Sequence, residues 1–176
     1  MLALPPIPSW HTMHPLIVHF PIVLLLIAPL FVVIGALRKP ERGFAFLLVA
    51  LILMALGTVS TFVATSSGAA AGELAQNAPQ VKAVLEQHQE LAETTEIAFS
   101  ALTLIFASIL FVPRMLKQES TRAISTVLPL VFLVFYATGA ISLANTAHEG
   151  GRLVYELGVR AQTQQSTVAN ESGNGE

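Results

Sequence analysis

The sequence predicts an all-α polytopic membrane protein, folded as a four-transmembrane-helix bundle. The 176-residue chain is 53% hydrophobic and only 11% charged, whereas ordinary soluble domains contain about 25% charged residues. Its mean hydropathy is +0.67. Four apolar stretches each approach or exceed the roughly 20 residues that cross a bilayer, and they cover residues 15–37, 44–66, 91–112 and 124–147.

The first two spans have clear ends. Span 15–37 follows a proline-rich start in which Trp10 suits a membrane–water interface. No basic segment precedes this span, so we expect a retained helix and not a cleaved signal peptide. It ends in the short polar connection 38–42, and the second span runs to the Ser-Ser-Gly cluster at 66–68.

The second pair of spans differs from the first by a polar extension. We expect the third helix to begin near Pro79 or Gln80, outside the hydrocarbon, because residues 81–96 are helix-forming but polar. The fourth span is expected to end at residues 148–151, where a Gly-Gly pair follows His148 and Glu149.

Residues 1–160 therefore constitute one transmembrane domain. Residues 161–176 are rich in Gln, Ser, Thr, Asn and Gly without periodicity, which predicts a disordered polar tail.

Positive charge orients the predicted bundle. The connections after spans one and three carry six of the nine Lys and Arg residues, and a Lys/Arg excess marks the cytoplasmic side. Both termini are then periplasmic, and the expected location is a bacterial inner membrane. The six are Arg38, Lys39, Arg42, Arg114, Lys117 and Arg122, against Lys82, Arg152 and Arg160 on the other side.

Composition excludes several functions. A net charge of −2 without a basic patch argues against a nucleic-acid partner. The absence of cysteine excludes disulfides, thiolate metal sites, iron–sulfur clusters and covalently attached c-type haem. No serine or threonine lies in a nucleophile motif, so an electron-transfer subunit is expected rather than a stand-alone enzyme.

Histidines from three predicted helices gather at the outer side. His14 and His19 lie about 140° and about 7.5 Å apart on one helix, so they can line two sides of a wide space. His88 and His148 lie at the outer ends of the third and fourth helices. Each alone is explained by an interfacial polar tip or a satisfied structural histidine. Together they favour a site, because ionisable groups at this depth are costly unless used.

Small residues fill the outer halves of spans two and four, as in segments 65–72 and 137–147. Such residues permit close helix packing. They also leave room for a flat apolar cofactor, and both interpretations stay open at this stage.

The donor set favours b-type haem with bis-histidine ligation. Imidazoles without cysteine also suit zinc or copper, but no HxxxH or HExxH pair is present. The candidate ligands are His14, His19, His88 and His148, with His88 and His148 as partners for the first two. Arg152 is a candidate for a haem propionate, although an interfacial arginine explains it equally well.

Glutamates recur along the third helix. Glu86, Glu90 and Glu93 form an acidic stripe that is typical of a solvated face or a docking surface for a basic partner. Glu96 borders the hydrocarbon, so it is the candidate for proton transfer or for orienting a histidine.

Two segments resemble a known family. The block HPLIVHFP at 14–21, with GGRLVYELGV at 150–159, is similar to a bacterial family of predicted membrane proteins called domain of unknown function 2231, over roughly residues 11–160. The resemblance implies a four-span bundle. It also implies an association with redox proteins, including Rieske-type ones, which favours electron transfer.

The sequence thus predicts a membrane-embedded b-type haem protein that carries electrons near the periplasmic face. Its expected surroundings are the lipid bilayer and a periplasmic or membrane redox partner or a quinone. Two alternatives remain: a cofactor-free membrane scaffold or subunit of a redox complex, and a zinc- or copper-binding membrane protein.

Overall fold

The fold is all-helical over the residues described by the computed structural model, which are 9–75, 79–117, 121 and 123–159. The predicted disordered tail, 161–176, lies outside these residues. The elements in chain order are η1 (Trp10–Thr12), α1 (His14–Ile17), α2 (His19–Leu37), α3 (Pro40–Ala75), α4 (Pro79–Met115), the π-helix η2 (Ala123–Val127) and α5 (Leu128–Tyr155).

Four helical segments of the described chain are long and apolar enough to cross a membrane, which confirms the predicted four-helix architecture. They are His14–Leu37, Pro40–Ala75, Pro79–Met115 and Ala123–Tyr155. Their outward faces are also apolar, as a lipid environment requires: Leu104 is 70% exposed and Val134 is 69% exposed.

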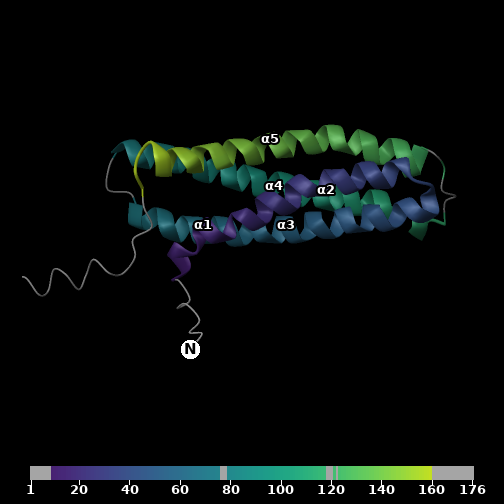
Figure 1. Ribbon diagram of the computed structural model, residues 1–176, viewed down its shortest axis with the longest axis horizontal. Coiled ribbons are helices and arrows are strands. Elements are labelled where there is room, and N and C mark those ends of the chain that lie inside the picture. Colours follow the sequence, from purple (N-terminus) through teal and green to yellow (C-terminus); the bar gives the residue numbers. More distant parts are fainter. Residues whose placement is uncertain (1–8, 76–78, 118–120, 122, 160–176) are drawn as a thin grey trace, which may run out of the picture.

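The helices form two antiparallel hairpins that pack side by side, α2 with α3 and α4 with α5 (Figure 1). The helices α2 and α4 end, and α3 and α5 begin, at one end of the bundle. The other end holds α1, the end of α3, the start of α4 and the end of α5 (Figure 1). We call this second end the histidine end, because His14 and His88 lie there.

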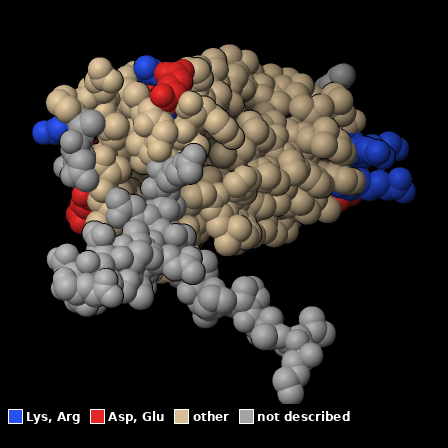
Figure 2. All heavy atoms as spheres, turned by 60° about the vertical axis from the view of Figure 1, so that its left-hand side comes forward, with Lys and Arg blue, Asp and Glu red and all other residues tan. Residues whose placement is uncertain are grey.

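Charged side chains are concentrated at the two ends of the bundle. Blue Lys and Arg side chains cluster at the end opposite the histidines, and a broad belt without charge lies between them and the acidic groups near the histidine end (Figure 2). A membrane-spanning bundle needs such a belt, because a charge at the bilayer centre is costly. The described cations of this basic end are Arg38, Lys39, Arg42, Arg114 and Lys117.

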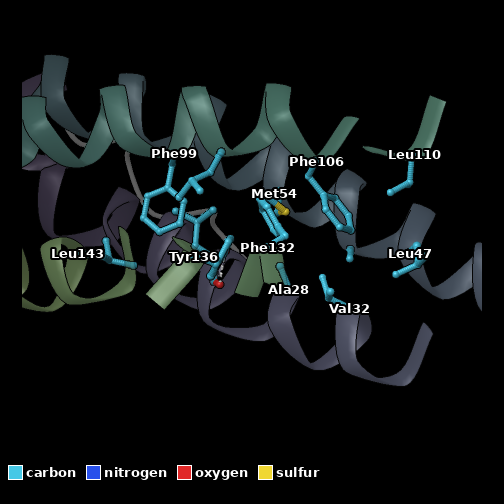
Figure 3. Packing of buried hydrophobic residues seen from close by; sticks show 13 residues of the cluster. Ala28, Val32, Leu47, Met54, Phe99, Phe106, Leu110, Phe132, Tyr136 and Leu143 are labelled. Carbon is cyan, nitrogen blue, oxygen red and sulfur yellow. Dashed lines mark hydrogen bonds between the residues drawn. The ribbon is translucent and has the colours of Figure 1, made fainter. Parts of the chain in front are cut away.

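Aromatic rings fill the centre of the bundle (Figure 3). Phe106 of α4 stacks on Phe132 of α5 with centroids 4.8 Å apart. Phe99 meets Tyr136 edge to face at 5.3 Å. These pairs join α4 to α5, and Leu25, Ala28, Val32 and Met54 complete the core from the other hairpin.

Helix ends follow proline and glycine, with one departure from expectation. The helix α4 begins at Pro79 as predicted. Pro21 has no N–H for the carbonyl of Ile17, and α1 stops at that residue. The fourth helix does not end at 148–151: α5 continues through Gly150 and Gly151 to Tyr155, since glycine weakens a helix by only about 1 kcal/mol per residue.

Candidate imidazole-pair site

His14, at the start of α1, is fixed by the neighbouring helix α3. Its Nδ1 lies 3.0 Å from the carbonyl oxygen of Ala64 and 3.1 Å from the hydroxyl oxygen of Ser67. Ser67 is fully buried, and its hydroxyl also donates to the Ala64 carbonyl. A carbonyl can only accept a hydrogen bond, so Nδ1 carries the proton.

His88, in the first part of α4, is fixed by α5 in the same way. Its Nδ1 donates to the carbonyl oxygen of Thr146 over 2.9 Å. Both imidazoles therefore present Nε2 as the nitrogen with a free lone pair. Metal-binding histidines show this arrangement, in which the second ring nitrogen donates to a carbonyl and holds the ring.

The two Nε2 atoms reach open space. Within the described chain neither has a hydrogen-bond partner, and neither is a buried atom left unsatisfied. Both rings line the same two cavities. These lone pairs are accordingly available to a ligand in the cavities.

Each ring packs against a glycine. A Cβ placed on Gly68 would lie 2.8 Å from Cε1 of His14, and one placed on Gly150 would lie 3.0 Å from Cε1 of His88. Any larger residue would displace the rings or the helices. The need for close approach explains glycine at both positions.

The rings of His14 and His88 lie edge to face across the two hairpins. Their centroids are 6.4 Å apart and their planes are inclined by 81°. Both imidazoles could hold one metal ion between them, since a metal-bound imidazole nitrogen lies about 2 Å from its ion.

Two cavities, of about 380 and 490 Å³, meet at this pair. The smaller extends toward the histidine end of the bundle, past Leu85 and Leu157. The larger extends into the bundle, past Thr61 and Leu143. Their volumes fall within the range of cofactor pockets. The residues common to both are His14, Pro15, His88, Gly150 and Val154.

A family model matches residues 10–163, and its description is predicted membrane protein, DUF2231. The chain belongs to the DUF2231 family. Neither a curated protein nor a solved structure gives a significant match.

Within this DUF2231 bundle, the predicted site residues take different positions. His14 and His88 come together, and His19 lines the larger cavity from the exposed side of α2. His148 is exposed and is not among the residues that line either cavity.

The two remaining candidates have their printed partners on their own helices. Arg152 pairs with Glu149 over 2.7 Å and with Glu156 over 3.1 Å, on its own helix. Glu96 is half-buried on α4, and its backbone carbonyl accepts a hydrogen bond from Ser100.

The sequence alone assigned no role in the site to Ser67, Gly150 or Glu149. Ser67 was part of a helix-terminating cluster, Gly150 was a helix end, and Glu149 had no role. Glu149 is 7% exposed, and it directly precedes the glycine on which His88 packs. The signal that could have revealed these positions is the equal spacing of equivalent residues in the two hairpins.

The donor set distinguishes between metals. Structural zinc takes four protein ligands and catalytic zinc three, whereas no group of three or more His, Cys, Asp or Glu comes together in the described part of the chain. Haem iron needs only two axial ligands from the protein. Two imidazoles with free Nε2 atoms beside these cavities could hold haem iron, or form part of the ligand set of another metal ion.

Proposed function

We propose that this membrane protein binds b-type haem between His14 and His88 and carries electrons. The observation behind the proposal is the pair itself: two imidazoles with fixed Nδ1 protons, free Nε2 atoms and centroids 6.4 Å apart. Cavities on two sides of the pair leave space for the plane of a porphyrin. Bound haem would supply a one-electron iron couple.

The residues of the chain would hold and orient the ligands. The carbonyls of Ala64 and Thr146 fix both ring planes, and Gly68 and Gly150 let the helices approach the rings. Apolar residues such as Leu85 and Leu143 would exclude water from the cavities. Axial ligands, their hydrogen bonds and burial are the means by which a protein sets a redox potential.

We further propose a bacterial inner membrane with the histidine end periplasmic. The described cations Arg38, Lys39, Arg42, Arg114 and Lys117 lie at the opposite end, which the positive-inside rule assigns to the cytoplasm. The redox partner would then be a periplasmic or membrane protein or a quinone. Exposed Glu86, Glu90 and Glu93 on α4 would favour a basic periplasmic partner.

The decisive experiment is a visible spectrum of the full chain, purified in detergent from cells supplied with haem. We expect a Soret band that shifts on reduction and one haem per chain. A colourless protein with stoichiometric zinc or copper would support the metal-binding alternative. A colourless, metal-free protein would support the scaffold.

Histidine variants test the ligand assignment. His14→Ala and His88→Ala should each abolish or strongly shift the Soret band, because one axial ligand is lost. His148→Ala is the matched control, since its exposed ring lies outside the cavities, and its spectrum should equal that of the wild type. Loss of the band in His148→Ala with retention in His88→Ala would refute the assignment. Circular dichroism confirms that each variant is folded.

A further inference from the structure

The two hairpins make the same contacts in the same register. His14 of the first hairpin bonds the carbonyl of Ala64 and packs on Gly68, four residues later. His88 of the second hairpin bonds the carbonyl of Thr146 and packs on Gly150, again four residues later. The partners are separated by 50 residues in the first hairpin and by 58 in the second, because the second has the longer connection.

A second set of contacts gives the same register. Leu25 lies eleven residues after His14, and it packs on Gly57, eleven residues before Gly68. Phe99 lies eleven residues after His88, and it contacts Gly139, eleven residues before Gly150. Two independent pairs of contacts therefore align the hairpins without adjustment.

Most buried positions of the four long helices follow this alignment. Positions 21, 25, 28, 32 and 36 of α2 are buried, and so are 95, 99, 102, 106 and 110 of α4, which lie 74 residues later. Positions 47, 50, 54, 57, 61 and 67 of α3 correspond to 129, 132, 136, 139, 143 and 149 of α5, 82 residues later. The bundle is thus an internal repeat, and the two imidazoles are equivalent positions in it.

The repeat exposes one difference beside the ligands. Ser67, whose hydroxyl contacts Nδ1 of His14, corresponds to Glu149 in the second hairpin. The Glu149 side chain is only 10% exposed and forms a 2.7 Å ion pair with Arg152. A buried carboxylate persists as a charge when it is paired in this way. A neutral hydroxyl therefore contacts His14, whereas the equivalent position of the second hairpin holds an acidic side chain, directly before the glycine on which His88 packs.

We propose that the negative charge of Glu149 lowers the redox potential of the haem centre. This inference rests on the proposed haem function. Reduction adds one electron to the iron, and a fixed negative charge on the ligand side disfavours that electron. For a unit charge about 10 Å from the iron and an effective dielectric constant of about 20, the ratio of reduced to oxidised centre would change roughly tenfold.

The test is a spectroscopic redox titration of the full-length protein with haem bound. Glu149→Gln should increase the ratio of reduced to oxidised centre about tenfold at a given potential, which corresponds to a midpoint potential about 59 mV higher for one electron. The amplitude of the Soret band should not change. Glu149→Asp should restore the wild-type potential. Glu156→Gln is the matched control, because it removes the other ion-pair partner of Arg152. The Glu156 side chain is 59% exposed, so solvent should screen its charge and the midpoint potential should change little.

A second variant keeps the inference testable if Glu149→Gln does not fold. Arg152→Gln leaves the carboxylate without its counter-charge and should lower the potential. Equal potentials in the wild type and in whichever of these two variants folds would overturn the role of Glu149 while leaving haem binding intact. A wild-type protein without a Soret band would instead overturn the proposed function, and this inference with it.

Discussion

The hydroxyl of Tyr136 donates a 2.7 Å hydrogen bond to the carbonyl oxygen of Leu25 (Figure 3). Pro29, one turn later in α2, has no N–H to bond that carbonyl. The hydroxyl of Tyr136, in the second hairpin, thus donates to a carbonyl of the first hairpin that has no N–H partner within its own helix. In the bilayer core, water is absent and cannot replace this bond.

Tyr136→Phe should therefore destabilise the bundle. It leaves a buried carbonyl unsatisfied, at a cost of about 1–3 kcal/mol, which unfolding in detergent would measure. Pro29→Ala returns an N–H to the helix and should cancel most of that cost in the double variant. Tyr155→Phe is the control, since Tyr155 is 90% exposed. Equal stability of Tyr136→Phe and the wild type would contradict this account.

Thr95 connects α4 to α5 through two hydroxyl contacts, to Ser142 at 2.8 Å and to Thr146 at 2.9 Å. Thr95→Val keeps the shape and removes both contacts, so it should cost about 1 kcal/mol at the roughly 0.6 kcal/mol measured per interhelical bond. Thr94→Val is the neighbouring control, because Thr94 is exposed and bonds only a carbonyl of its own helix. A lower melting temperature for Thr94→Val than for Thr95→Val would contradict the stabilising role of the two Thr95 contacts.

The adjacent glycines of α5 should respond differently to alanine. A Cβ on Gly151 meets nothing within 4 Å, so Gly151→Ala should stabilise the helix by up to about 1 kcal/mol. A Cβ on Gly150 would press on His88 at 3.0 Å, so Gly150→Ala should gain less stability and weaken haem binding. Haem titration measures the change in haem affinity, and the melting temperature measures the change in stability. Equal haem affinities and equal melting temperatures of the two variants would contradict a role of Gly150 in holding the His88 ring.

Single cysteines can test the orientation, because the natural chain contains none. Lys39 and Glu90 are exposed at opposite ends of the bundle. With a membrane-impermeant maleimide added to whole spheroplasts, Glu90→Cys should be labelled and Lys39→Cys should react only after lysis. The reverse pattern would place the histidine end in the cytoplasm.

Much of the fold was predictable because composition alone demands it. Few charges and four long apolar stretches admit little besides a helical membrane bundle. The start of α4 at Pro79 also followed from local chemistry. The continuation of α5 through Gly150 and Gly151 did not. Gly150 lies within the helix because the distant ring of His88 occupies the space that a side chain at this position would fill.

The candidate site was predictable only in its residue types. His14 and His88 were among the candidates, but their pairing depends on the relative position of two hairpins, which no local pattern sets. The repeat could have supplied that register, since His14 to Leu25 and His88 to Phe99 have equal spacing, as have Gly57 to Gly68 and Gly139 to Gly150. The repeat is hard to recognise in the sequence, because equivalent positions such as Ser67 and Glu149 hold chemically different residues.

The lengths of α3 and α4 have an electrical consequence. At 36 and 37 residues they extend about 54 Å, well beyond the roughly 30 Å of hydrocarbon. A bilayer centred on the four spans would place the imidazoles of the histidine end near the rim of its hydrocarbon layer. Electrons exchanged there with a donor and an acceptor on the same side would traverse almost none of the transmembrane voltage, and their transfer would neither consume nor build up that voltage.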